Sequence, residues 1–63
     1  MTINGIEKDI GSLSLSSLIE SQGYQSKRVV VEIDGVVIQR SAFDSFWLKG
    51  DEKIEIVCFV GGG

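Results

Sequence analysis

The stretch that decides the fold is Val29-Val30-Val31-Glu32-Ile33-Asp34-Gly35-Val36-Val37-Ile38-Gln39. Its first five residues are rich in β-branched side chains, which favour an extended strand. Asp34-Gly35 follows, a dipeptide typical of the type I′ turn that closes a two-residue hairpin. Residues 36–39 then return as a second strand. The middle of the chain is therefore predicted to be a β-hairpin.

A second hairpin is predicted upstream, at the start of the chain. Asn4-Gly5 repeats the type I′ signal between strand candidates at 1–3 and 6–10. Residues 6–10 are the weaker of the two strand candidates, with Ile6, Lys8 and Ile10 in alternating positions before Gly11.

A helix is predicted between the two hairpins. Ser14 can cap its start by accepting a backbone hydrogen bond from the first turn. Leu15, Leu18 and Ile19 follow at the spacing of one narrow apolar stripe. Gly23 is placed to end the helix in the left-handed conformation. Several serines lie within it and are mediocre helix formers, so packing must hold the helix in place.

A short helical turn is predicted after the central hairpin. Ser41 followed by Asp44 has the pattern of a capping box. Phe43, Phe46 and Trp47 then share one face of that turn, at i, i+3 and i+4. We interpret these aromatic residues as a satellite core beneath the loop.

The order of these elements predicts an α+β fold. A final strand runs over 54–60, and one helix can cover only one face of a sheet this size. Pairing the last strand parallel to the N-terminal strand places both in the centre and leaves their hairpin partners at the edges. This is the ubiquitin-like β-grasp, a mixed sheet of about five strands with one main helix across one face. A simple antiparallel sheet crossed by the helix is the alternative.

Alternation along the last strand assigns its side chains to two faces. Ile54, Ile56 and Cys58 share one face, and Glu55 lies on the other. Because Glu55 belongs in solvent, the isoleucine face is predicted to be the core. Cys58 is accordingly predicted to be buried as a small apolar residue.

The opposite face of the same strand is predicted to dock a partner. Val57 and Phe59 lie there, Val30 on the neighbouring strand joins them, and Val60 follows at the strand end. An exposed apolar patch of this kind is typical of an interaction surface.

Composition excludes several classes of protein. The 63 residues allow one domain, assigned to 1–59, with a flexible tail at 60–63. The net charge of −3 disfavours nucleic acid and anionic membranes as partners. No apolar run approaches the ~20 residues of a membrane span, and no secretory signal begins the chain. We expect a soluble, cytoplasmic protein.

Classical catalytic and metal sites are also excluded by composition. The sequence contains no histidine and one cysteine, so it has neither a Ser–His or Cys–His pair nor the usual zinc ligands. Asp51, Glu52 and Glu55 match no calcium loop. We predict no catalytic residue, no metal and no cofactor bound by this chain.

The chemistry is instead predicted to lie in the tail, Val60-Gly61-Gly62-Gly63. Glycine has no Cβ, so Gly61, Gly62 and Gly63 can enter a narrow cleft that would reject other residues. The reactive group at the tip is a carboxylate, which nothing in this chain activates. Another protein's active site must do so.

Taken together, these residues resemble the ThiS family, the sulfur carriers of thiamine biosynthesis. The resemblance runs from end to end, and its most specific part is the C-terminal stretch. It is carried by Asn4-Gly5, the helix opening at 14–19, Val31-Glu32-Ile33-Asp34-Gly35, Ile38-x-Arg40, Leu48 before Gly50-Asp51, and Ile54-Glu55-Ile56-Val57-x-Phe59-Val60-Gly61-Gly62-Gly63.

The resemblance implies a protein cosubstrate rather than an enzyme. In that family a ThiF-type adenylating enzyme, using ATP and magnesium, converts the terminal carboxylate, here Gly63, to an acyl-adenylate. Sulfur from a cysteine desulfurase or another donor then yields a thiocarboxylate. A ThiG-type thiazole synthase takes the sulfur into the thiazole ring.

Two other functions stay open at this point. A carrier of the same fold can serve molybdopterin or cysteine synthesis, handing sulfur to a different acceptor. A non-catalytic ubiquitin-like interaction module would instead have an inert tail and a functional sheet face. Loss of adenylation on removal of Gly62 and Gly63 separates a carrier from such a module.

Overall fold

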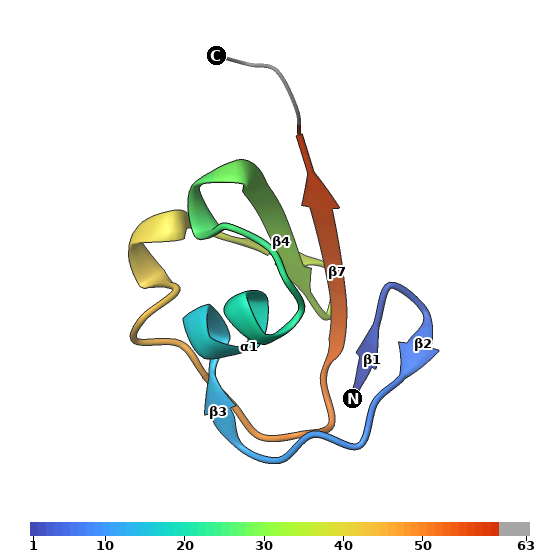
Figure 1. Cartoon of the computed structure of the whole chain (residues 1–63). Helices are drawn as coiled ribbons and strands as arrows, with labels where there is room; N and C mark the ends of the chain where they lie inside the picture. Colours follow the sequence, from blue (N-terminus) through green and yellow to red (C-terminus); the bar gives the residue numbers. More distant parts are fainter. Residues whose placement is uncertain (60–63) are drawn as a thin grey trace.

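The computed structural model describes residues 1–59, and Figure 1 shows a sheet with one main helix packed across it. The strands are β1 (Thr2–Ile3), β2 (Ile6–Glu7), β3 (Leu13–Ser14), β4 (Val29–Ile33), β5 (Val36–Ile38), β6 (Trp47–Leu48) and β7 (Lys53–Cys58). The helices are α1 (Leu15–Ser21) and two 3-10 turns, η1 (Ser26–Arg28) and η2 (Arg40–Ala42).

The main sheet has the predicted β-grasp order, β2-β1-β7-β4-β5. β7 pairs parallel to β1 and antiparallel to β4, while each hairpin partner lies at an edge. The alternative of a simple antiparallel sheet is excluded by the parallel β1–β7 pair. β7 is therefore the central strand, bonded on both sides.

Both predicted type I′ turns are confirmed. Asn4 and Asp34 have φ of 51°, and each is followed by a glycine at positive φ, Gly5 at 81° and Gly35 at 85°. These left-handed conformations favour Asn, Asp and Gly, which explains why two such dipeptides fix two hairpins.

The helix also begins and ends where the sequence predicts. The Ser17 N–H donates to the Ser14 side chain at 3.2 Å, which caps the first turn. Gly23 has φ of 85°, and its N–H donates to the Glu20 carbonyl. The Tyr24 N–H reaches back to the Ile19 carbonyl at 3.1 Å, which completes a Schellman motif.

The core lies between α1 and one face of the sheet. Leu15, Leu18 and Ile19 of α1 are fully buried, and so are Val31 and Ile54 of the two central strands. The narrow apolar stripe predicted for the helix is thus the side that faces the sheet.

The aromatic residues after the central hairpin are arranged differently from the prediction. Phe43 lies in the main core at 2% exposure, Phe46 packs against that core, and Trp47 is 63% exposed. Trp47 belongs to β6 rather than to a helical turn, so the three do not form a satellite core. Between Phe43 and Trp47 the backbone changes from a helical turn to an extended conformation. The i, i+3 and i+4 spacing on which the prediction rested therefore does not place these residues on one face.

Two local predictions in this region are also wrong. The helical turn begins two residues early, at Arg40 rather than after Ser41, and no side chain caps it, so Ser41 and Asp44 form no capping box. A small sheet of β3 and β6 was not predicted at all. Two-residue strands are too short for alternation to reveal them.

Cys58 is exposed, contrary to prediction. Alternation assigns it to the same side of β7 as Ile54 and Ile56, which are buried. It is, however, the last residue of β7, and none of residues 1–59 covers it there. Alternation predicts the direction of a side chain but not whether another element reaches far enough to bury it.

No helix among the described residues is long and apolar enough to cross a membrane.

Candidate functional site

The candidate site is the end of β7, the strand that leads into the glycine tail. Two turns hold this strand from opposite sides (Figure 1). Their first residues, Asn4 and Asp34, use their side chains as well as their backbones to bind it.

The Asn4 side chain extends the β1–β7 ladder beyond the end of β1. Its Nδ2 donates to the Ile56 carbonyl at 3.1 Å, and its Oδ1 accepts from the Ile56 N–H at 2.7 Å. The Asn4 N–H donates to the Ile54 carbonyl at 2.8 Å. The amide thus replaces the backbone of a missing strand residue. Sequence reasoning identified Asn4 only as a turn residue, since the pairing depends on where β7 runs.

On the other side, Asp34 binds the start of β7. Its Oδ1 accepts from the Lys53 N–H at 3.0 Å, and its own N–H donates to the Lys53 carbonyl at 2.9 Å. At the opposite end, the Phe59 N–H donates to the Arg28 carbonyl at 3.0 Å. Hydrogen bonds therefore fix the strand from Lys53 to Phe59, the last described residue. The predicted tail residues Val60, Gly61, Gly62 and Gly63 lie outside the described residues.

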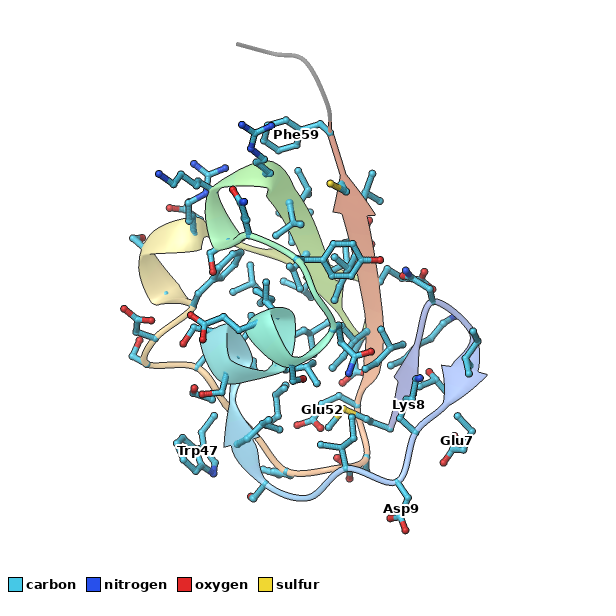
Figure 2. All side chains as sticks on the ribbon, viewed as in Figure 1. Glu7, Lys8, Asp9, Trp47, Glu52 and Phe59 are labelled. Atoms are coloured by element: carbon cyan, nitrogen blue, oxygen red, sulfur yellow. The ribbon has the colours of Figure 1, made fainter. Side chains whose placement is uncertain are left out.

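Three of the four residues predicted to dock a partner lie together on the exposed face of the sheet. Val30 is 45% exposed, Val57 is 61% exposed and Phe59 is 43% exposed. Val30 and Val57 are direct cross-strand partners, and Phe59 lies at the end of β7 (Figure 2). We call Val30, Val57 and Phe59 the open-face patch.

An acidic pair borders the open-face patch. Glu32 and Glu55 are directly opposed across β4 and β7, two residues along each strand from Val30 and Val57 and on the same face. Like charges in directly opposed positions repel one another. The sequence pattern places Glu32 and Glu55 on two separate predicted strands. Only the register of β4 and β7 shows that they face each other.

The loop before β7 is held by one carboxylate. Glu52 is only 8% exposed, and it accepts the Lys49 N–H at 2.8 Å and the Gly50 N–H at 2.9 Å. Burial, the largest single influence, raises the pKa of Glu52, but the backbone N–H bonds from Lys49, Gly50 and the loop outweigh it. The pKa is therefore lowered from its ordinary value of 4.5.

Other chemistry is sparse over residues 1–59. No group of three His, Cys, Asp or Glu side chains in this part of the chain is arranged to hold a metal ion. The arrangement that the described residues do offer is a firmly bonded strand end beside an exposed apolar patch.

Comparison with known proteins identifies the family. The model of the ThiS family matches residues 1–63. The chain is 31% identical over 64 residues to a thiazole synthase of Paramagnetospirillum magneticum, with 100% of this chain covered, and it spans only 20% of that relative's length. It is 33% identical over 51 residues to the uncharacterized protein ycf40 of Pyropia yezoensis, covering 81% of this chain and 72% of that protein.

Solved structures agree with the sequence comparison. The crystal structure of the thiamine biosynthesis protein ThiS from Geobacter metallireducens superposes with a TM-score of 0.80 at 33% identity, covering 98% of this chain and 96% of that chain. The solution structure of a thiamine biosynthesis protein from the same organism gives a TM-score of 0.78 and covers 85% of that chain. The match of the family model over the whole chain, together with this shared fold, shows that the chain belongs to the ThiS family.

Proposed function

We propose that this chain is a sulfur carrier of thiamine biosynthesis, with the carboxylate of Gly63 as the group that carries sulfur. The observation that carries the proposal is the match of the ThiS family over residues 1–63, which includes the glycine tail. The relatives named for thiazole synthesis and thiamine biosynthesis support the same pathway.

In the proposed reaction, bonds form and break at the terminal carboxylate of Gly63, and a partner enzyme activates that carboxylate. A carboxylate oxygen of Gly63 attacks the α-phosphate of ATP in a ThiF-type enzyme, and pyrophosphate leaves. A sulfur nucleophile supplied by a cysteine desulfurase or another donor then attacks the acyl carbon, and AMP leaves. Sulfide gives the thiocarboxylate directly, whereas a persulfide donor gives an acyl disulfide whose S–S bond a thiol reductant then cleaves. ATP and magnesium belong to the partner. A free carboxylate is a poor electrophile, so adenylation is what makes the second step possible.

The described residues support this role because they hold in place the strand that leads to the tail. Asn4, Asp34 and Arg28 bond the backbone of β7 up to Phe59, so the tail begins from a fixed point. Four residues of extended chain span at most about 14 Å. A partner that binds the open-face patch would therefore have its active site within about that distance of Phe59.

A thiazole synthase is proposed as the acceptor. The whole of this chain aligns with one fifth of a protein that is named thiazole synthase. Joining two modules in one polypeptide raises their effective concentration, which favours partners that act on each other. This relationship supports a ThiG-type acceptor over one in molybdopterin or cysteine synthesis.

Sulfur delivery tests the proposal. The thiocarboxylate form of this chain would be incubated with a purified thiazole synthase and its other substrates, and thiazole formation would be measured. We expect one thiazole for each carrier consumed, and none from the untreated carboxylate form. Sulfur delivered only to a molybdopterin precursor or to a cysteine precursor would contradict the proposal. Full activity of a carrier lacking Gly62 and Gly63 would point instead to an interaction module.

A further inference from the structure

Three exposed cations gather at the end of the sheet where β7 stops. Lys27 and Arg28 belong to η1, and Arg40 begins η2. We call Lys27, Arg28 and Arg40 the basic rim. The chain has six lysines and arginines in total, so half of its cations are in this one region.

One backbone and one side-chain hydrogen bond fix the basic rim beside the end of β7. The Arg28 carbonyl accepts from the Phe59 N–H at 3.0 Å. Arg40 lies beside η1 because its Nε donates to the Ser26 carbonyl at 3.2 Å. In Figure 1 the turn at 26–28 accordingly lies next to the end of β7. The rim therefore flanks one side of the end of β7.

The charge of the basic rim is not neutralised by carboxylates of residues 1–59. Within this part of the chain, none of the three cations forms an ion pair, although Asp44 lies four residues after Arg40. This local excess is notable because the protein as a whole carries a net charge of −3. A partner that contacts the rim thus meets local positive charge on a molecule whose net charge is negative.

The basic rim is continuous with the open-face patch. Val30 follows Arg28 by two residues, and Phe59 bonds Arg28 directly. A partner covering Val30, Val57 and Phe59 would therefore also cover Arg28. Interfaces commonly combine an apolar centre with a charged border that sets the orientation and the rate of encounter.

We propose that the basic rim docks against an acidic protein surface bordering the entrance to the adenylating enzyme's active site. This deepens the proposed function and depends on it, since the enzyme is the partner that must admit the tail. The apolar patch supplies contact area, while the rim orients the carrier with its tail toward the entrance. A protein surface is favoured over nucleic acid because the apolar open-face patch beside the rim requires an apolar partner surface, which a phosphate backbone does not offer.

A pair of matched double variants tests the rim. Lys27→Glu with Arg28→Glu reverses two rim charges, whereas Lys8→Glu with Lys49→Glu makes the same change in net charge elsewhere. Lys8 lies far from Phe59 in Figure 2. Binding of each variant to a purified ThiF-type adenylating enzyme would be measured with and without ATP, at low and high salt. Urea unfolding would check that both variants are folded.

We expect the rim variant to bind about tenfold or more weakly, and the control variant to bind within about threefold of the parent. Salt should weaken the parent more than the rim variant, because the rim contact is electrostatic. Equal binding by the two double variants would overturn the inference while leaving the sulfur carrier role intact. A loss seen only with ATP present would also overturn it, because the rim would then contact nucleotide phosphate. Failure of the parent chain to bind would overturn both proposals.

Discussion

The two faces of β7 differ in what their residues do, although they alternate along one strand. Ile54 and Ile56 point toward α1 and are 0% and 4% exposed, while Val57 on the other face is 61% exposed. The apolar residues of the helix-covered face stabilise the fold. An apolar residue on the open face contributes little to folding and is available to a partner. Adjacent residues of similar hydrophobicity therefore have separable roles, and substitutions can test the separation.

The largest expected effect is on the covered face. Ile54→Ala should lower the free energy of unfolding by about 2–5 kcal/mol, because it leaves a cavity under α1. A domain of this size has only a few kcal/mol of stability, so much of the variant should be unfolded. Urea unfolding followed by circular dichroism measures the change. A loss no larger than that of Val57→Ala would contradict the assignment of the two faces.

A smaller loss of stability is expected from a substitution in the loop that precedes β7. Glu52→Gln should cost about 1–2 kcal/mol at neutral pH, because an amide accepts the Lys49 and Gly50 N–H groups less strongly than a carboxylate. The folded protein holds the Glu52 proton less tightly than the unfolded chain does. The parent should therefore lose stability as the pH falls below the ordinary pKa of 4.5, through the lower pKa of the folded state.

The control for this loop is the pH profile of the variant. Free energies of unfolding measured from pH 7 to pH 3 should show a shallower decline for Glu52→Gln than for the parent. Parallel profiles would mean that Glu52 does not titrate with a lowered pKa.

On the open face, binding rather than stability should change. Val57→Ser should weaken binding to the adenylating enzyme about tenfold, as expected for a residue near the centre of an interface. Val36→Ser is the matched control, because Val36 is also 61% exposed but lies beside the Asp34-Gly35 turn, opposite Ile33. Both variants should unfold within about 0.5 kcal/mol of the parent. Equal losses of binding would remove the open-face patch from the interface.

The smallest effect concerns the acidic pair on the open face. Glu32→Gln removes the repulsion from Glu55 and should raise the free energy of unfolding by about 0.2–1 kcal/mol. Added salt should raise the stability of the parent more than that of the variant, since it screens the repulsion that only the parent retains. Identical salt responses would show that the two carboxylates do not interact.

The sequence was informative where a local signal has one physical solution. Asn4-Gly5 and Asp34-Gly35 adopt the left-handed turns that those residue types favour, and Gly23 ends the helix in the same conformation. With both hairpins and the helix located, few arrangements were left for the final strand. The order of elements indicated the parallel β1–β7 pairing but left a simple antiparallel sheet as an alternative, which only the register excludes.

Features that depend on distant neighbours were not predictable. Cys58 is exposed because nothing among residues 1–59 covers its side chain at the end of β7, and Trp47 is exposed because the chain becomes extended before it. The Asn4 side chain pairs with Ile56, 52 residues away. The basic rim likewise joins η1 to η2 through a contact between Arg40 and Ser26. Each depends on how elements meet, which a one-dimensional pattern does not record.

The central claim is that Gly63 receives sulfur from another protein's active site, and intact mass spectrometry tests it most directly. The chain would be incubated with a ThiF-type adenylating enzyme, ATP, magnesium and a sulfur donor. The account predicts a gain of about 16 Da, oxygen replaced by sulfur at the terminal carboxylate, and no gain when Gly62 and Gly63 are removed. An unchanged mass in the full chain, or an equal gain in the truncated one, would contradict it.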